Sequence, residues 1–97
     1  LELLARLLDD FKAVQAGVTV AVAQLDHDAL RNHSHILIAL AGAVGADVLQ
    51  AAAVSLNAVA RRADDAAALE LVEDVLPQIT GLLGQLAHVA ARLARVG

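Results

Sequence analysis

Four histidines are the residues of this chain best suited to chemistry, and His35 is the most accessible of them. The helical segment that carries His35 turns by about 100° per residue, which gathers its apolar side chains into one stripe. His35 projects from nearly the opposite side. An exposed imidazole on a rigid helix, with mainly short side chains around it, can be approached closely by the reactive group of another protein. This arrangement is typical of a phosphorylatable histidine.

The helix around His35 divides into two faces. The residues of the apolar stripe are Leu30, His33, Leu37, Leu40, Ala41 and Val44. The residues of the outer side, around His35, are Asp28, Arg31, Asn32, Ala39, Gly42 and Ala46. We therefore predict that this helix buries the first set against its neighbours and exposes the second.

The other histidines do not form a metal site with His35. His33 and His35 diverge by about 200° on a helix, so they cannot bind one ion together. His27 lies two turns before His35 on broadly the same side, but Arg31 between them is a poor neighbour for a cation. His88 is isolated. We expect no metal site, and we expect His33 to be a boundary or core residue hydrogen-bonded to a neighbouring helix.

Two further groups of residues could be taken for functional sites, but their spacing and surroundings do not support this interpretation. Glu70, Glu73 and Asp74 follow helical spacing, which predicts a solvated face rather than an acid–base pair, since no companion group stands near them. Gly42 and Gly45 neither follow a strand nor have a lysine nearby, so they do not predict a phosphate-binding loop.

Composition limits the class of protein. With 97 residues the chain is a single domain over 1–97, too short to hold a kinase or nucleotide-binding module as well. Alanine supplies much of the hydrophobic fraction of 59%, and no interval reaches the roughly 20 apolar residues that a membrane span requires. We predict no transmembrane helix and no signal peptide. Because the chain has no methionine, we expect Leu1 to mark either a trimmed end or the edge of a domain within a longer protein.

Charge and cysteine content limit the kinds of partner and site that the chain can have. Seven basic and eleven acidic residues give a net charge of −4, with the arginines scattered and a single aromatic residue, Phe11. Nucleic acid would require a basic face with polar or aromatic readers, so we expect no nucleic-acid binding. The absence of cysteine excludes disulfides and thiolate metal sites and is compatible with a reducing compartment.

The helical spacing of the apolar residues, together with residues that start or end helices, predicts four helices. The first covers 1–23, including the β-branched run 18–22, which has no second strand to pair with. The second covers 28–44, with Asp26 or Asp28 as its cap, and the third covers 47–62, with Asp47 as its cap. The inner face expected for the third helix consists of Val48, Leu49, Ala52, Leu56 and Val59.

The fourth helical stretch is capped by Asp64 and Asp65 and reaches towards Val96. Pro77 interrupts it, because proline lacks the amide hydrogen and clashes with the preceding turn. We therefore expect a kinked or two-part last helix. The connections between the helices are short, which predicts an all-α, antiparallel up-down-up-down four-helix bundle.

Three stretches of the chain follow the pattern of one known family. From His35 the sequence reads HILIALAGAVGA, which matches H-x-L-K-G at Leu37 and ends in a hydrophobic-Gly-Ala step at 44–46. Residues 26–35 match D-x-x-x-L-x-x-x-x-H, and residues 56–64 are similar to L-x-x-A-A-R-x-G-D with Ala63 in the place of the glycine. These patterns resemble those of the histidine-containing phosphotransfer domain, the Hpt module of bacterial-type phosphorelays.

Two residues depart from that family pattern. Ile38 replaces the lysine and Ala39 replaces the glycine that follows it. Alanine still permits close approach, but the loss of lysine removes a positive charge beside the incoming phosphoryl group. Ile38 lies between the core stripe and His35, where it enlarges an apolar docking patch. Arg31, one turn before His35, is positioned to supply a substitute charge.

The resemblance implies a phosphorelay intermediate in the cytoplasm. His35 would be the phosphoacceptor, and Arg31, Asn32, Ile38, Ala39 and Gly42 would dock the partner. That partner would be a response-regulator receiver domain, a sensor histidine kinase or both. The chain itself would have no cofactor and no independent kinase activity, since the receiver brings the magnesium ion. We expect a monomer.

Two alternatives stay open at the level of sequence. The first is a non-catalytic Hpt-like adaptor that binds a receiver or kinase without being phosphorylated, which the missing lysine favours. The second is a histidine-kinase dimerisation-type domain, because residues 34–37 resemble its S-H-x-L start. Four helices in one chain argue against the second, since that architecture completes its bundle with another chain.

Overall fold

The computed structural model describes residues 2–96, which form four helices joined by three short connections. The helices are α1 (Glu2–Ala23), α2 (His27–Ala43), α3 (Asp47–Arg61) and α4 (Asp65–Val96). Within this part of the chain there is no strand, so the all-α class is confirmed, and the β-branched run 18–22 is helical. Leu1, the first residue of the predicted first helix, lies outside the described residues.

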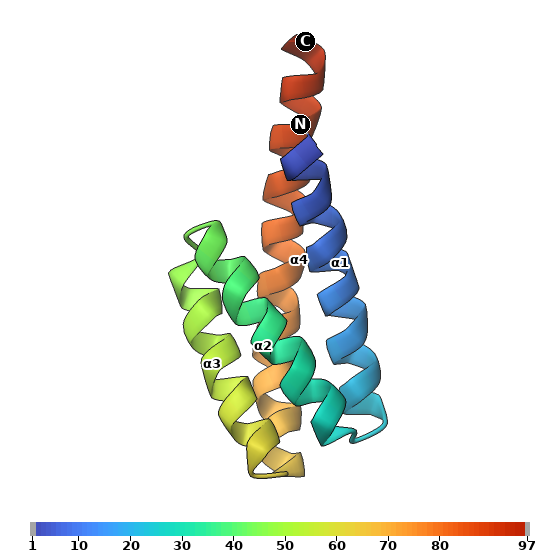
Figure 1. Ribbon diagram of the computed structural model, residues 1–97, viewed down its shortest axis with the longest axis vertical. Coiled ribbons are helices and arrows are strands. Elements are labelled where there is room, and N and C mark those ends of the chain that lie inside the picture. The colour runs from blue at the N-terminus through green and yellow to red at the C-terminus, as the bar shows by residue number, and fades with distance from the viewer. Residues whose placement is uncertain (1, 97) are drawn as a thin grey trace.

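The four helices pack in a ring. α1 contacts α2 and α4, and α3 contacts the same two helices. Figure 1 shows that the start of α1 and the end of α4 lie at the same end of the molecule, where α4 extends beyond the α2–α3 pair. The resulting particle is elongated, with extents of 47 × 23 × 18 Å. The α2–α3 pair therefore covers only part of α4.

The core lies where all four helices meet. Its largest buried apolar side chains are Phe11, Val18, Leu30, Leu37, Leu56, Val75 and Ile79. The apolar stripe predicted for the helix around His35 is largely confirmed, since Leu30, Leu37 and Ala41 are buried. Val48, which was predicted on the inner face of the third helix, is a correction, because it is 75% exposed. The buried side of α3 runs through Leu49, Ala53 and Leu56, and Val48 precedes this stripe by about 100°, on the edge of the helix.

α4 continues through Pro77 without a break. The prediction of a two-part last helix is therefore wrong. Pro77 is exposed, whereas Val75 and Ile79 on either side of it are both 0% exposed. Their packing holds the helix together at the point where proline removes a backbone hydrogen bond.

Aspartates cap two of the helices. Asp26 precedes α2 and its Oδ1 accepts a hydrogen bond from the Ala29 amide at 3.0 Å. Asp64 does the same for α4 through the Ala67 amide at 3.1 Å. Asp47 does not cap α3, contrary to the sequence prediction. The capping position is taken by Ala46, without a side-chain hydrogen bond, and Asp47 contributes only its charge to the first turn.

Each connection contains one residue in the left-handed region. These residues are Leu25, with φ of 51°, Gly45, with φ of 71°, and Ala63, with φ of 53°. Glycine adopts this conformation without steric cost, so Gly45 suits the position that follows the end of α2. Leu25 and Ala63 hold it in spite of their Cβ atoms, so both connections carry local backbone strain.

Substitution of Ala63 by glycine is expected to stabilise the protein. Glycine removes the Cβ clash at a φ of 53° and thereby offsets its own greater chain entropy, for a net gain of about 0.5–1 kcal/mol. Thermal unfolding of the Ala63→Gly variant measures this gain. Ala58→Gly, an exposed change inside α3, is the control and is expected to lose about 1 kcal/mol. Equal effects of the two substitutions would contradict the assignment of strain to Ala63.

Candidate functional site

The packing of α2 determines which of its residues face solvent. Leu30, Leu37 and Ala41 are buried at 0–2% exposure and fix the inner face of the helix. His35 is exposed on the opposite side, as its position relative to that stripe predicts. The inner contacts therefore hold the backbone of α2 rigid while leaving the imidazole accessible.

His35 lies at a shallow groove between α2 and α3 with a volume of about 320 Å³. The residues that line the groove are Asp28, Arg31, Asn32, His35, Asn57 and Arg61. The structure thus brings His35 together with two of the residues predicted to dock a partner, Arg31 and Asn32. It adds two residues of α3 that the sequence analysis did not place there, Asn57 and Arg61.

A hydrogen-bonded network holds the floor of this groove. The Asn57 side chain donates from Nδ2 to the Arg31 carbonyl oxygen at 3.0 Å and to Ser34 Oγ at 3.1 Å. Ser34, which is 0% exposed, donates in turn to the same Arg31 carbonyl at 3.0 Å. Because a buried polar group is costly without partners, this network specifies how α3 sits on α2 beside His35.

Two guanidinium groups flank the groove. Arg61 Nε donates to Asn57 Oδ1 at 3.1 Å, which orients its terminal nitrogens without neutralising its charge. Arg31 Nη2 pairs with Asp28 Oδ1 at 3.1 Å, on a half-exposed face of α2. Two cations against one carboxylate leave the groove locally positive although the chain carries −4 overall. The arrangement therefore favours an anion beside His35.

The remaining residues predicted to dock a partner lie farther along α2. Ala39 and Gly42 are exposed, and Ile38 is half-buried and packs against the core. None of the three lines the groove. A Cβ on Gly42 would collide with Nε2 of Gln50, which donates to the Ile38 carbonyl oxygen at 3.1 Å. Gly42 therefore leaves room for the Gln50 side chain of α3, whose flexible end would have to move if a Cβ were added.

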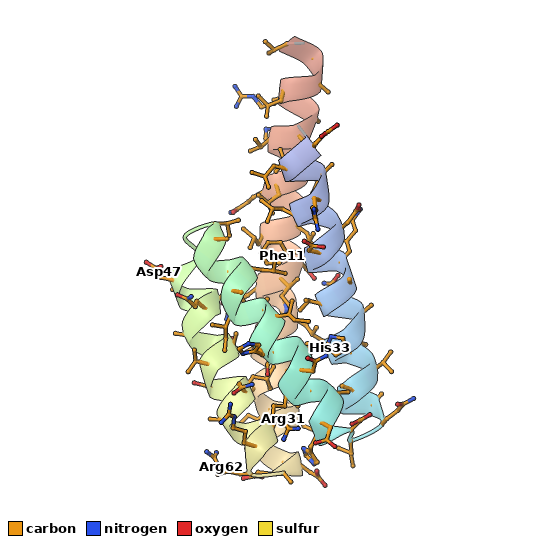
Figure 2. All side chains as sticks on the ribbon, viewed as in Figure 1. Phe11, Arg31, His33, Asp47 and Arg62 are labelled. Atoms are coloured by element: carbon orange, nitrogen blue, oxygen red, sulfur yellow. The ribbon has the colours of Figure 1, made fainter. Side chains whose placement is uncertain are left out.

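His33 occupies the boundary between α2 and α1 (Figure 2). Its half-buried ring lies directly over Gly17, where any Cβ would overlap it. The boundary position is as predicted, but the predicted hydrogen bond is absent among residues 2–96, and ring packing on Gly17 takes its place. His33 and His35 thus face different helices.

Gly17→Ala is expected to destabilise the protein by about 1–3 kcal/mol, because the added methyl group meets the His33 ring in a packed contact. Chemical denaturation measures the free energy of unfolding. Removal of the ring by His33→Ala leaves room for the methyl group, so Gly17→Ala is expected to cost little in that background. An equal cost in both backgrounds would show that the methyl group and the ring do not clash.

The third histidine on α2 joins two helix ends. His27 Nε2 lies 2.5 Å from Asp65 Oδ1 at the start of α4. No group of three or more His, Cys, Asp or Glu side chains able to hold a metal ion occurs between residues 2 and 96. Of the histidines, His35 is the one that lines the arginine-flanked groove.

Comparison with known proteins yields no relative. No protein-family model matches the chain, and no curated protein or solved structure matches it either. Over the part of the chain that the structure describes, none of the helices has both the length and the hydropathy needed to cross a membrane.

Proposed function

We propose that this protein is a phosphorelay intermediate of the Hpt kind. His35 accepts a phosphoryl group from a receiver-domain aspartate or a kinase and passes it to another receiver domain. The observation that carries the proposal is the exposed imidazole of His35 at a groove that two arginines make positive. The groove supplies what phosphoryl transfer requires of an acceptor, namely access along the line of attack and charge for the phosphate oxygens.

In each of the two transfers, one bond to phosphorus forms and one breaks. A neutral imidazole nitrogen of His35 attacks the phosphorus of the donor, an N–P bond forms, and the donor's P–O bond breaks to leave a carboxylate. In the second transfer a receiver carboxylate attacks that phosphorus and the imidazole leaves with its electron pair. Arg31 and Arg61 offset the negative charge of the phosphoryl oxygens, while the receiver contributes its magnesium ion.

The docking surface in this proposal extends from the groove along the exposed side of α2. It includes Arg31 and Asn32 at the groove, Ala39 and Gly42 farther along, and the exposed part of Ile38. Short side chains at Ala39 and Gly42 leave room for a partner near the imidazole, and Ile38 adds an apolar contact where the family carries a lysine. We place this function in the cytoplasm, where receivers and the catalytic parts of sensor kinases act.

The proposal also includes the finer architecture of an Hpt bundle. We propose that the helices run in up-down-up-down order and that α4 bends at Pro77. The connections of only three residues support the up-down-up-down order, because helices joined by such short connections pack antiparallel to one another. The missing amide hydrogen of Pro77 supports the bend.

The test of this function is phosphoryl transfer from a receiver domain that carries ³²P on its aspartate. The chain is incubated with a panel of such receivers, and the label that moves to it is examined for stability in acid and in base. Phosphohistidine is labile in acid and stable in base, so acid-labile label on this chain is the expected result. No transfer from any receiver or kinase would overturn the proposal.

One observation favours a second candidate, a non-catalytic adaptor. Ile38 stands where the Hpt pattern has a lysine, so the family's charge beside the histidine is missing from α2. An adaptor would bind a receiver with the same affinity before and after His35→Ala and would form no phosphohistidine with any donor. The labelling experiment therefore separates the two candidates.

A further inference from the structure

We propose that two copies of this chain dimerise through the distal face of α4, which consists of Leu82, Val89, Leu93 and Val96. Val89 and Leu93 are each 46% exposed and Val96 is 87% exposed. Figure 1 shows that this end of α4 projects past the α2–α3 connection, with only the start of α1 alongside. The inference is independent of the proposed function and replaces the sequence-based expectation of a monomer.

The apolar pattern of α4 continues from the core to the exposed tip. Val75, Leu82, Val89 and Val96 follow one another at seven-residue spacing, so they form nearly one line along the helix. Exposure rises along that line from 0% at Val75 to 46% at Val89 and 87% at Val96. A line of this spacing is typical of a helix that packs against another helix. The α2–α3 pair covers the first half of this line, whereas Val89 and Val96 in the second half are 46% and 87% exposed.

A hollow lies at the base of the distal face. It has a volume of about 390 Å³ and is lined by Ala46, Asp47, Val48, Leu49, Gln78, Gly81, Leu82 and Gln85. Val48 is 75% exposed in it, and nothing lies within 4 Å of the position that a Cβ on Gly81 would take. The hollow therefore has room, and an exposed valine, for an apolar side chain from outside.

A second copy supplies that side chain. If a two-fold axis passes by Val89, the two α4 helices run in opposite directions and Val89 packs against its own copy. Val96, seven residues after Val89, then comes level with Leu82 of the other copy, seven residues before. The exposed Val96 of each copy thereby reaches the hollow of the other. Such an interface is isologous, so each contact occurs twice.

The charges around the two halves of this interface are complementary. Asp47 lies at the hollow, and Arg92 lies in the groove with Val89, Leu93 and Val96. α4 carries Arg92 and Arg95 but no acidic residue after Asp74. Asp47 and these two arginines form no ion pair with other residues between 2 and 96. The dimer brings each Asp47 towards the arginines at the end of the other copy's α4, which favours a second copy as the occupant.

Single cysteines test the dimer directly, because the chain has none of its own. Val89→Cys places two thiols together at the two-fold axis, so mild oxidation is expected to give a disulfide-linked dimer as the main product. Leu69→Cys is the control, since Leu69 also lies on α4 and is 47% exposed but is far from the distal face. Equal cross-linking of the two variants, or none in either, would overturn the proposal.

Analytical ultracentrifugation over a range of concentrations measures the dimer without a cross-link. Val89→Asp is expected to weaken it at least about tenfold, because two carboxylates are then buried against each other, and Leu69→Asp is expected to leave it unchanged. Asp47→Arg is expected to weaken it, and addition of Arg92→Asp and Arg95→Asp to that variant to restore it. Circular dichroism checks that each variant remains helical. A wild-type chain that stays monomeric up to millimolar concentration would contradict the proposal.

Discussion

His35→Ala is expected to abolish phosphoryl transfer to this chain completely. The substitution removes the nucleophilic nitrogen, and the groove is lined by no other imidazole. Its two arginines are protonated at neutral pH, so their nitrogens are poor nucleophiles. His35 is exposed and makes no hydrogen bond to other residues between 2 and 96, so its removal is expected to leave the fold and its melting temperature nearly unchanged. The measurement is the amount of acid-labile ³²P on the variant after incubation with a labelled receiver.

His88→Ala is the matched control for this experiment. His88 is also an exposed histidine on a helix, but it belongs to α4 and does not line the groove. The variant is expected to take up label at the rate of the wild-type chain. Label that persists on the His35→Ala variant would assign the phosphoryl group to another residue, and a loss of label in both variants would point to an effect unrelated to position 35.

The sequence was a good guide to the helices because their signals are local. Apolar spacing and the aspartates before α2 and α4 act within a few residues of each helix end, and they placed the boundaries to within one residue or so. Asp47 misled as a cap, because it has the right residue type but lies one position inside α3. The expectation that Pro77 divides the last helix into two parts was also wrong, because buried residues on both sides of Pro77 carry α4 through it.

The outward position of His35 was predictable, but the groove beside it was not. The apolar stripe of one helix settles which way His35 points. By contrast, the groove exists because Asn57 and Arg61 of α3 lie across from Arg31 of α2, and this register between helices depends on packing that the periodicity of either helix does not contain. The four-residue spacing of Asn57 and Arg61 was visible, yet it is equally typical of an ordinary solvated face.

Substitution of Arg61 is expected to slow phosphoryl transfer to His35 without preventing it. Arg61 Nε is held by Asn57 Oδ1, which leaves the terminal nitrogens of the guanidinium for an anion in the groove. A unit charge about 4 Å from another is worth roughly 1 kcal/mol in water and about 4 kcal/mol at a protein surface. Arg61→Ala is therefore expected to lower the transfer rate about tenfold, and the double variant Arg31→Ala, Arg61→Ala about 100-fold.

Arg62→Ala separates this local effect from a change in overall charge. Arg62 is the next residue along the chain and carries the same charge, but it ends α3 and does not line the groove (Figure 2). Rapid-quench measurement of transfer from a labelled receiver is expected to give the wild-type rate for Arg62→Ala. The transfer rate of the wild-type chain is expected to depend more strongly on salt concentration than the rate of Arg61→Ala. Equal losses in the Arg61 and Arg62 variants would mean that the arginines attract the receiver from a distance, whereas a loss confined to Arg61 places its charge beside the phosphoryl group.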